Sequence, residues 1–229
     1  MAFGNGPKIV SDGLILSLDA SDRNSYSGSG AAWNDLSGNG LNVTLVNSPT
    51  YITNPNSLLF DGVDEYGSTG NNTLISSTNS LSFDFWVKPT GTSTSSQTIL
   101  GKDTNSSPSG HLLIRRVNST DLRYNIANGS QNNSTNFFVG SIDNWVNIQI
   151  TYNYTSGDYN VYKNGVLFTN TTTASGFPLT NAPINIASYS GPPLPWTGNI
   201  SVCKMYNRVL SATEVLQNYN ALKSRFNLK

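Results

Sequence analysis

Carboxylate pairs, the groups that could carry acid–base chemistry, are scarce in this chain. Of its 229 residues only 13 are acidic, and two of these are glutamates, Glu65 and Glu214. Glycoside hydrolysis commonly needs two carboxylates on opposite sides of the bond that breaks. Asp61, Asp64 and Glu65 form a small acidic cluster, but Asp61-Gly62 is a typical turn dipeptide. We therefore expect that the protein is not an enzyme.

Nucleophilic and metal-binding side chains are equally rare. Cys203 is the single cysteine and His111 the single histidine. A nucleophilic cysteine needs a nearby base, and a zinc site needs several Cys or His ligands. We interpret Cys203 as a packing residue, because a lone cysteine behaves as a small apolar side chain. His111 is interpreted as a residue at the end of a strand.

One short loop offers oxygen ligands at the spacing of a calcium site. Asp35, Ser37 and Asn39 occupy alternate positions and Gly40 follows, as in the first half of a calcium-binding loop. The closing glutamate is missing, because Val46 stands at that position. The alternatives are a calcium site and an Asx-turn, and we favour the Asx-turn. Apart from calcium, we predict no cofactor.

Three aromatic residues could stack on a sugar ring or contact a partner: Tyr189, Trp196 and Tyr26. Tyr189 and Trp196 flank a loop with three prolines, and a stiff loop loses little entropy on binding. For Trp196, sugar binding, subunit contact and core packing stay open, because an amphipathic aromatic side chain suits all three. The other tryptophans are interpreted as structural: Trp33, Trp86 and Trp145.

A helix near the end of the chain is the clearest local element. Ser211 and Glu214 form a capping box, in which each side chain satisfies a free backbone N–H. Leu210 and Val215 are placed to form a hydrophobic staple. Apolar residues recur from there at helical spacing, which predicts a short helix over about 212–223.

Strand patterns fill most of the remaining chain. Residues 81–89 and 145–154 alternate apolar and polar side chains. Asn164-Gly165 is the strongest short hairpin signal and separates two further strands. Clusters of Ser, Thr and Asn, such as 92–96 and 132–136, are predicted as loops. Roughly a dozen short strands at this spacing predict an all-β sandwich or jelly roll.

Composition limits the classes of partner. Basic and acidic residues number 13 each, so the formal net charge is zero. Nucleic-acid binding usually needs a basic face, so we expect no nucleic-acid partner. No apolar run reaches the about 20 residues of a membrane span, and the N-terminus lacks the apolar core of a signal peptide. We expect no membrane insertion, an N-terminal arm at 1–8 and one domain at 9–229.

Several short motifs occur together in a characteristic order. They are Asp12-Gly13-Leu14 with Leu18-Asp19-Ala20, Trp33-Asn34-Asp35-Leu36-Ser37-Gly38-Asn39-Gly40, Phe60-Asp61-Gly62-Val63-Asp64-Glu65-Tyr66, Phe83-Asp84-Phe85-Trp86-Val87-Lys88-Pro89, Trp145-Val146, Tyr162-Lys163-Asn164-Gly165 and Tyr206-Asn207-Arg208-Val209-Leu210-Ser211. Together they resemble the laminin-G-like, concanavalin-A-like lectin/glucanase family, from about Ile9 to Leu222. The resemblance implies two antiparallel sheets in a jelly-roll sandwich with one short C-terminal helix, but it does not fix the function.

The Asn-rich, single-domain form also resembles virion proteins of tailed bacteriophages. That resemblance implies a non-catalytic protein on the virion surface, either decorating the capsid or accessory to the head or tail. Its partners would be other virion proteins, host surface glycans and a second copy of the chain. The alternative is a carbohydrate-binding adhesin or lectin module of a tail fibre or cell surface. A glycoside hydrolase is the third hypothesis.

Overall fold

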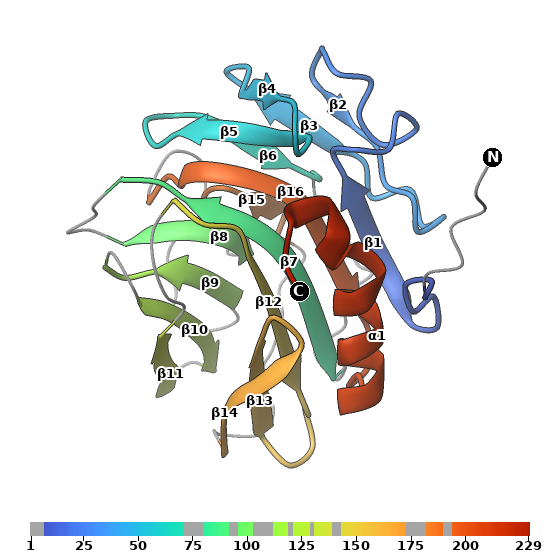
Figure 1. The fold of residues 1–229 in the computed structure, drawn as a ribbon. Coiled ribbons are helices and arrows are strands. Elements are labelled where there is room, and N and C mark those ends of the chain that lie inside the picture. Colours follow the sequence, from blue (N-terminus) through green and yellow to red (C-terminus); the bar gives the residue numbers. More distant parts are fainter. Residues whose placement is uncertain are drawn as a thin grey trace.

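The computed structural model describes residues 7–70, 80–91, 96–102, 112–118, 121–128, 131–138, 143–172, 182–189 and 194–229, with backbone alone for 121–128 and 131–138. Two antiparallel sheets form a sandwich, and one short helix lies on the outer side of one of them (Figure 1). The predicted all-β fold is therefore confirmed. Within the described residues, no helix is long and apolar enough to span a membrane.

Sheet A has eight strands in the order β14-β13-β12-β7-β16-β5-β4, with β1 also paired to β16. The β13–β14 hairpin turns at Asn164-Gly165, as the sequence predicts, and both residues have the positive φ that this turn requires. The strands are β1 (Leu14–Asp19), β4 (Thr50–Ile52), β5 (Ser57–Asp61), β7 (Leu81–Pro89), β12 (Val146–Tyr152), β13 (Asp158–Lys163), β14 (Val166–Thr172) and β16 (Thr197–Tyr206).

Sheet B also has eight strands, in the order β11-β10-β9-β8-β15-β6-β3-β2. The prediction of a loop at 132–136 was wrong, because these residues lie in β11 and pair one by one with β10. Pairing with a neighbouring strand here overrides the weak strand preference of Asn and Ser. The strands are β2 (Ala32–Trp33), β3 (Val43–Val46), β6 (Tyr66–Ser68), β8 (Gln97–Lys102), β9 (Leu112–Arg116), β10 (Asp121–Asn128), β11 (Gln131–Phe138) and β15 (Ile184–Ile186).

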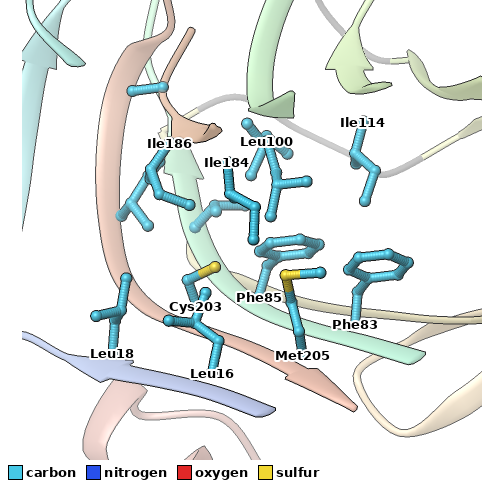
Figure 2. Packing of buried hydrophobic residues seen from close by; sticks show 14 of the residues in the cluster. Leu16, Leu18, Phe83, Phe85, Leu100, Ile114, Ile184, Ile186, Cys203 and Met205 are labelled. Atoms are coloured by element: carbon cyan, nitrogen blue, oxygen red, sulfur yellow. The ribbon is translucent and has the colours of Figure 1, made fainter. Parts of the chain in front are cut away.

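The main core fills the space between the two sheets. Figure 2 shows Phe83 and Phe85 of β7 on one side and Leu100 and Ile184 of sheet B on the other, and all four are fully buried. Cys203 lies among them with no exposed surface, which confirms its interpretation as a packing residue. Burial raises the pKa of its thiol far above the ordinary value, so the sulfur stays protonated.

The outer face of sheet A is covered by the C-terminal helix α1 (Ala212–Leu222) and the 3₁₀ turn η1 (Lys223–Phe226). Trp86, which alternation places on this outer face, stacks on Tyr219 and Phe226 with ring centroids 5.7 and 4.2 Å apart. Two buried polar residues of β12 face the same layer. Asn147 donates to the Asp84 carboxylate at 2.7 Å, and Gln149 donates to the Val215 carbonyl at 2.9 Å. The second of these bonds fixes the helix to the sheet.

The predicted capping box is confirmed. The Ser211 hydroxyl accepts the Glu214 N–H at 3.3 Å, and the Glu214 carboxylate accepts the Ser211 N–H at 2.8 Å. Arg208 also donates to both carboxylate oxygens of Glu214, at 2.6 and 3.0 Å. These bonds lower the pKa of Glu214 to about 2. Leu210 and Val215, the predicted staple, share one buried cluster.

Candidate functional site

Trp196 lies in the core and not on the surface. Its side chain is fully buried, and its backbone N–H donates to the Ala187 carbonyl at 2.9 Å. The Arg116 guanidinium lies 5.7 Å from the centre of the indole ring. Of the three alternatives, core packing is therefore the one that the structure supports. Contact of Trp196 with a sugar or a partner is contradicted, because no part of the ring is accessible.

Tyr26 is also buried, with 3% of its surface exposed. Its hydroxyl donates to the Gly30 carbonyl at 3.1 Å, and its ring packs against Tyr51 at a centroid distance of 5.4 Å. Burial raises the pKa of the phenol above its ordinary value. The prediction that Tyr26 contacts a glycan or partner was wrong, because the ring packs inside a loop that follows β1.

Tyr189 is the one of the three aromatic residues that keeps accessible surface, since it is half-buried. Its backbone crosses sheet B directly above Gly101. A Cβ atom at Gly101 would lie 2.8 Å from the Tyr189 Cα atom and 2.9 Å from the Ser188 carbonyl oxygen. Asn185 donates to the Tyr189 carbonyl at 3.2 Å. The lack of a side chain at Gly101 thus lets this segment approach the sheet closely, and the Asn185 amide holds it there.

A row of small polar residues runs across sheet B beside Tyr189. Ser68 pairs with both Thr44 and Asn185, and Asn185 pairs with Gly101. We call these four residues the outer row. Their neighbours in the same strands are core residues, and alternate residues of a strand point to opposite faces. The core neighbours are Val43, Leu45, Ile184 and Ile186.

The outer row offers neutral hydrogen-bonding groups and no ionisable side chain. Thr44 is exposed and Ser68 half-buried, while Asn185 is buried beneath the Tyr189 segment. Hydroxyl groups both donate and accept, and a half-exposed tyrosine adds an apolar ring with a polar edge. This set suits a neutral, hydroxyl-rich ligand. Sequence reasoning named Tyr189 but missed Thr44 and Ser68, although Thr44 stands between two apolar residues.

A second polar surface lies at the opposite sheet. A hollow of about 330 Å³ is lined by five residues of the β13–β14 hairpin: Asp158, Asn160, Asn170, Thr171 and Thr172. The Asp158 carboxylate accepts hydrogen bonds from Ser156 at 2.7 Å and Thr172 at 2.9 Å. These two bonds lower the pKa of Asp158. The hollow lacks an aromatic side chain, which distinguishes it from the outer row.

The loop with calcium spacing uses its carboxylate for protein contacts. Asp35 accepts N–H groups from Ser17 at 2.8 Å, Ser37 at 2.9 Å and Leu41 at 3.1 Å, and the Ser37 hydroxyl at 2.7 Å. Asn39 donates to the Leu14 carbonyl at 3.2 Å. This geometry is that of an Asx-turn that fastens the loop to β1. Among the described residues, no three His, Cys, Asp or Glu side chains are grouped to hold a metal ion.

The acidic cluster after β5 forms a turn. Glu65 accepts the Asp61 N–H at 2.8 Å, and the Asp61 carboxylate accepts the Val63 N–H at 2.8 Å. Partial burial raises the pKa of Glu65, and the neighbouring carboxylates add to this effect. Both carboxylates therefore have structural partners.

His111 and residues 1–6 of the arm lie outside the described residues. The Lys8 carbonyl accepts a hydrogen bond from the Gln217 side chain of α1 at 2.7 Å.

Comparison with known proteins identifies a family and a set of similar structures. The family described as "Concanavalin A-like lectin/glucanases superfamily" matches residues 61–216. The botulinum neurotoxin serotype D binding domain is 19% identical, with a TM-score of 0.74 over 92% of this chain and 52% of that chain. The binding domain of botulinum neurotoxin DC in complex with SialylT is 18% identical, with a TM-score of 0.73 over 93% and 52%.

The binding domain of Paraclostridial Mosquitocidal Protein 1 is also similar, at 17% identity and a TM-score of 0.70 over 92% of this chain and 52% of that chain. The chain thus spans about half the length of the solved structures that it matches. At these identities the likeness shows a common fold. No curated protein matches the chain significantly.

Proposed function

The chain belongs to the concanavalin A-like lectin/glucanase superfamily, and we propose that it is a non-catalytic carbohydrate-binding module whose ligand lies on the outer row of sheet B. The observation that carries this proposal is the crossing of Tyr189 over Gly101. It places the backbone of a half-buried tyrosine over Gly101, at one end of the row that Ser68 and Thr44 continue across the sheet. Binding sites commonly combine an apolar surface with a few fixed polar groups.

The similar structures add support by analogy. One is a toxin binding domain in complex with SialylT, and another is described by the dependence of cell entry of botulinum neurotoxin type C on interaction with two ganglioside molecules. This chain matches 52% of each of those chains, so these descriptions concern domains of about twice its length. Fold likeness alone does not transfer a ligand, so the outer row is the basis of the proposal for this chain.

Glycan-array screening of the purified chain, followed by calorimetric titration of the best ligand, tests this proposal. Tyr189→Ala and Thr44→Ala should each weaken binding about tenfold, which corresponds to about 1.4 kcal/mol. Asn170→Ala is the matched control, because Asn170 is exposed in the hollow of the opposite sheet. Equal binding by the wild type and the two outer-row variants, or loss in Asn170→Ala alone, would move the site away from sheet B.

We further propose that the module is carried on the surface of a tailed-phage virion. The support is the Asn-, Ser- and Thr-rich, charge-neutral composition and the sequence resemblance to virion proteins. Quantitative mass spectrometry of purified particles tests this location. Hundreds of copies per particle would indicate capsid decoration, and a few to tens would indicate a tail or fibre adhesin. Absence from particles would refute the virion role and leave the carbohydrate-binding module standing.

A further inference from the structure

Exposed apolar side chains gather at one corner of the molecule. Val166, Leu167 and Phe168 of β14 are 67%, 49% and 44% exposed, and Leu216 of α1 is 45% exposed. We call these four residues the apolar corner. A Cβ atom at Gly165 would lie 3.1 Å from the Leu216 Cδ1 atom, so the turn that leads into β14 lies against the helix. The other exposed large apolar residues of the described chain, Leu36 and Val63, lie elsewhere in the sequence.

The strand that carries the corner is an unprotected sheet edge. Among the strands that the structure describes, β14 ends sheet A, and its seven residues include neither a charged residue nor a proline. Protein edges are usually shortened or charged, because free backbone groups invite pairing with another chain. The edge strands β4 and β2 are three and two residues long. The edge strand β11 has eight residues and also lacks charge and proline, but it is mostly Asn, Ser, Thr and Gln. β14 is therefore the long, uncharged edge whose first half is apolar.

A β-bulge interrupts the alternation of this edge. In the β13–β14 register, Val161 pairs with Thr169 and Tyr162 pairs with Leu167, so Phe168 lies between paired positions. A bulge bends its strand and changes the direction of the side chains next to it. Val166 and Leu167 precede the bulge and point to opposite faces of the strand. The exposure of all three apolar residues therefore means that both faces of this edge are accessible.

The composition of the apolar corner matches the centre of a protein interface. Its four side chains are between 44% and 67% exposed, and large exposed apolar groups rimmed by polar residues mark interaction sites. Interfaces have an apolar centre and a polar rim. Thr169 and Asn170, which continue β14, supply polar groups next to the corner.

We propose that the apolar corner is a dimer interface that binds a second copy of this chain about a two-fold axis. In a two-fold contact the same patch faces itself, so a charge close to the axis would meet its own copy. The segment 164–172 carries no charge, which removes this repulsion. Arg208 and Glu214, near the start of α1, are paired with each other at 2.6 Å. A charged partner protein would find no complementary group in the corner.

This contact would leave the carbohydrate site free. The apolar corner belongs to sheet A and α1, whereas the outer row lies on the outer side of sheet B. The dimer proposal does not depend on the proposed function. If both hold, each dimer presents two outer rows, and a surface with many glycans would be bound with the increased avidity of a two-site ligand.

Sedimentation equilibrium of the full chain over a range of micromolar concentrations tests the proposal. We expect a species of twice the 24.7 kDa chain mass. The double variant Leu167→Ser/Phe168→Ser should raise the dimer dissociation constant at least tenfold. Leu216→Glu on the helix should do the same, and it keeps the test valid if the β14 variant fails to fold.

Val63→Ser is the matched control, because Val63 is 66% exposed but lies in the turn after β5. It should leave the dissociation constant unchanged, with circular dichroism confirming the fold of every variant. A wild-type chain that stays monomeric would overturn the proposal and point to a different protein as the occupant of the corner. Equal weakening by Val63→Ser, or no effect of either corner variant on a dimer, would also overturn it.

Discussion

Replacing Trp196 by alanine should destabilise the fold. The protein that remains folded should still bind glycan. The side chain is fully buried, with Arg116 beside its ring. Truncation of a buried Trp to Ala costs about 3–5 kcal/mol through lost burial and the cavity left behind. For a chain of this length each kcal/mol lowers Tm by about 2–4 °C, so we expect a fall of roughly 6–20 °C.

Two further variants make this prediction specific. Trp196→Phe keeps an aromatic ring and removes an indole N–H that is buried without a hydrogen-bond partner among the described residues, so it should cost less than about 2 kcal/mol. Tyr189→Ala, at a half-exposed position, should lower Tm by no more than a few degrees. Equilibrium urea unfolding and differential scanning calorimetry give the free energies and the Tm values.

The result that would refute this reasoning is easily recognised. If Trp196→Ala kept the wild-type Tm within about 2 °C, less than the effect of 1 kcal/mol, and yet abolished glycan binding, Trp196 would be an accessible ligand contact. The core position of its ring would then be wrong. A large loss of Tm, with the remaining folded protein still binding glycan, is the outcome that the packing predicts.

Four other substitutions test the cap of helix α1, the crossing of Tyr189 over Gly101, and the Asx-turn at Asp35. Ser211→Ala should cost about 1 kcal/mol of unfolding free energy in urea titrations, because a capping bond is lost; an unchanged midpoint would contradict this. The pKa of Glu214 is depressed to about 2, so its pair with Arg208 stabilises the fold at pH above about 4.5 and is lost as pH falls toward 2. Because the pair is partly exposed, Glu214→Gln should flatten this acid loss by about 1 kcal/mol or less, measured as Tm against pH. Gly101→Ala should cost about 1–3 kcal/mol, because its Cβ would meet backbone atoms, and should weaken glycan binding; wild-type affinity would contradict the outer-row site. Asp35→Ala should lower Tm by several degrees, because three N–H groups lose their acceptor, and calcium should leave the wild-type Tm unchanged.

Features set by neighbours in the sequence could be predicted well. The capping box at Ser211 and Glu214, the Asn164-Gly165 turn and the alternation in β7 and β12 depend on a few adjacent residues, and the structure confirms them. The family resemblance added the two-sheet arrangement. Burial of an aromatic ring is different, because it depends on which distant segments cover it. This is why the prediction for Tyr26 was wrong and why the sequence left three alternatives open for Trp196.

The candidate site could be predicted in part for the same reason. Thr44, Ser68 and Asn185 come from three strands that are far apart in the sequence and become neighbours through the order of sheet B. Alternation could have placed each of them on a solvent face, but it could not show that these faces meet. Gly101 carried no signal of its own, since its role is to leave room for Tyr189.

The contacts of Val10 and β1 with the C-terminal part of the chain have a consequence for synthesis on the ribosome. The Val10 N–H donates to the Asn218 side chain at 2.8 Å, and Tyr206 donates to the Val10 carbonyl at 3.1 Å, while β1 pairs along β16. Partners separated by 208 positions are translated about 10–40 s apart at ordinary rates of elongation. During that interval β1 has no partner strand, because β16 has not yet been synthesised. A chaperone that shields β1 should therefore raise the yield of folded protein.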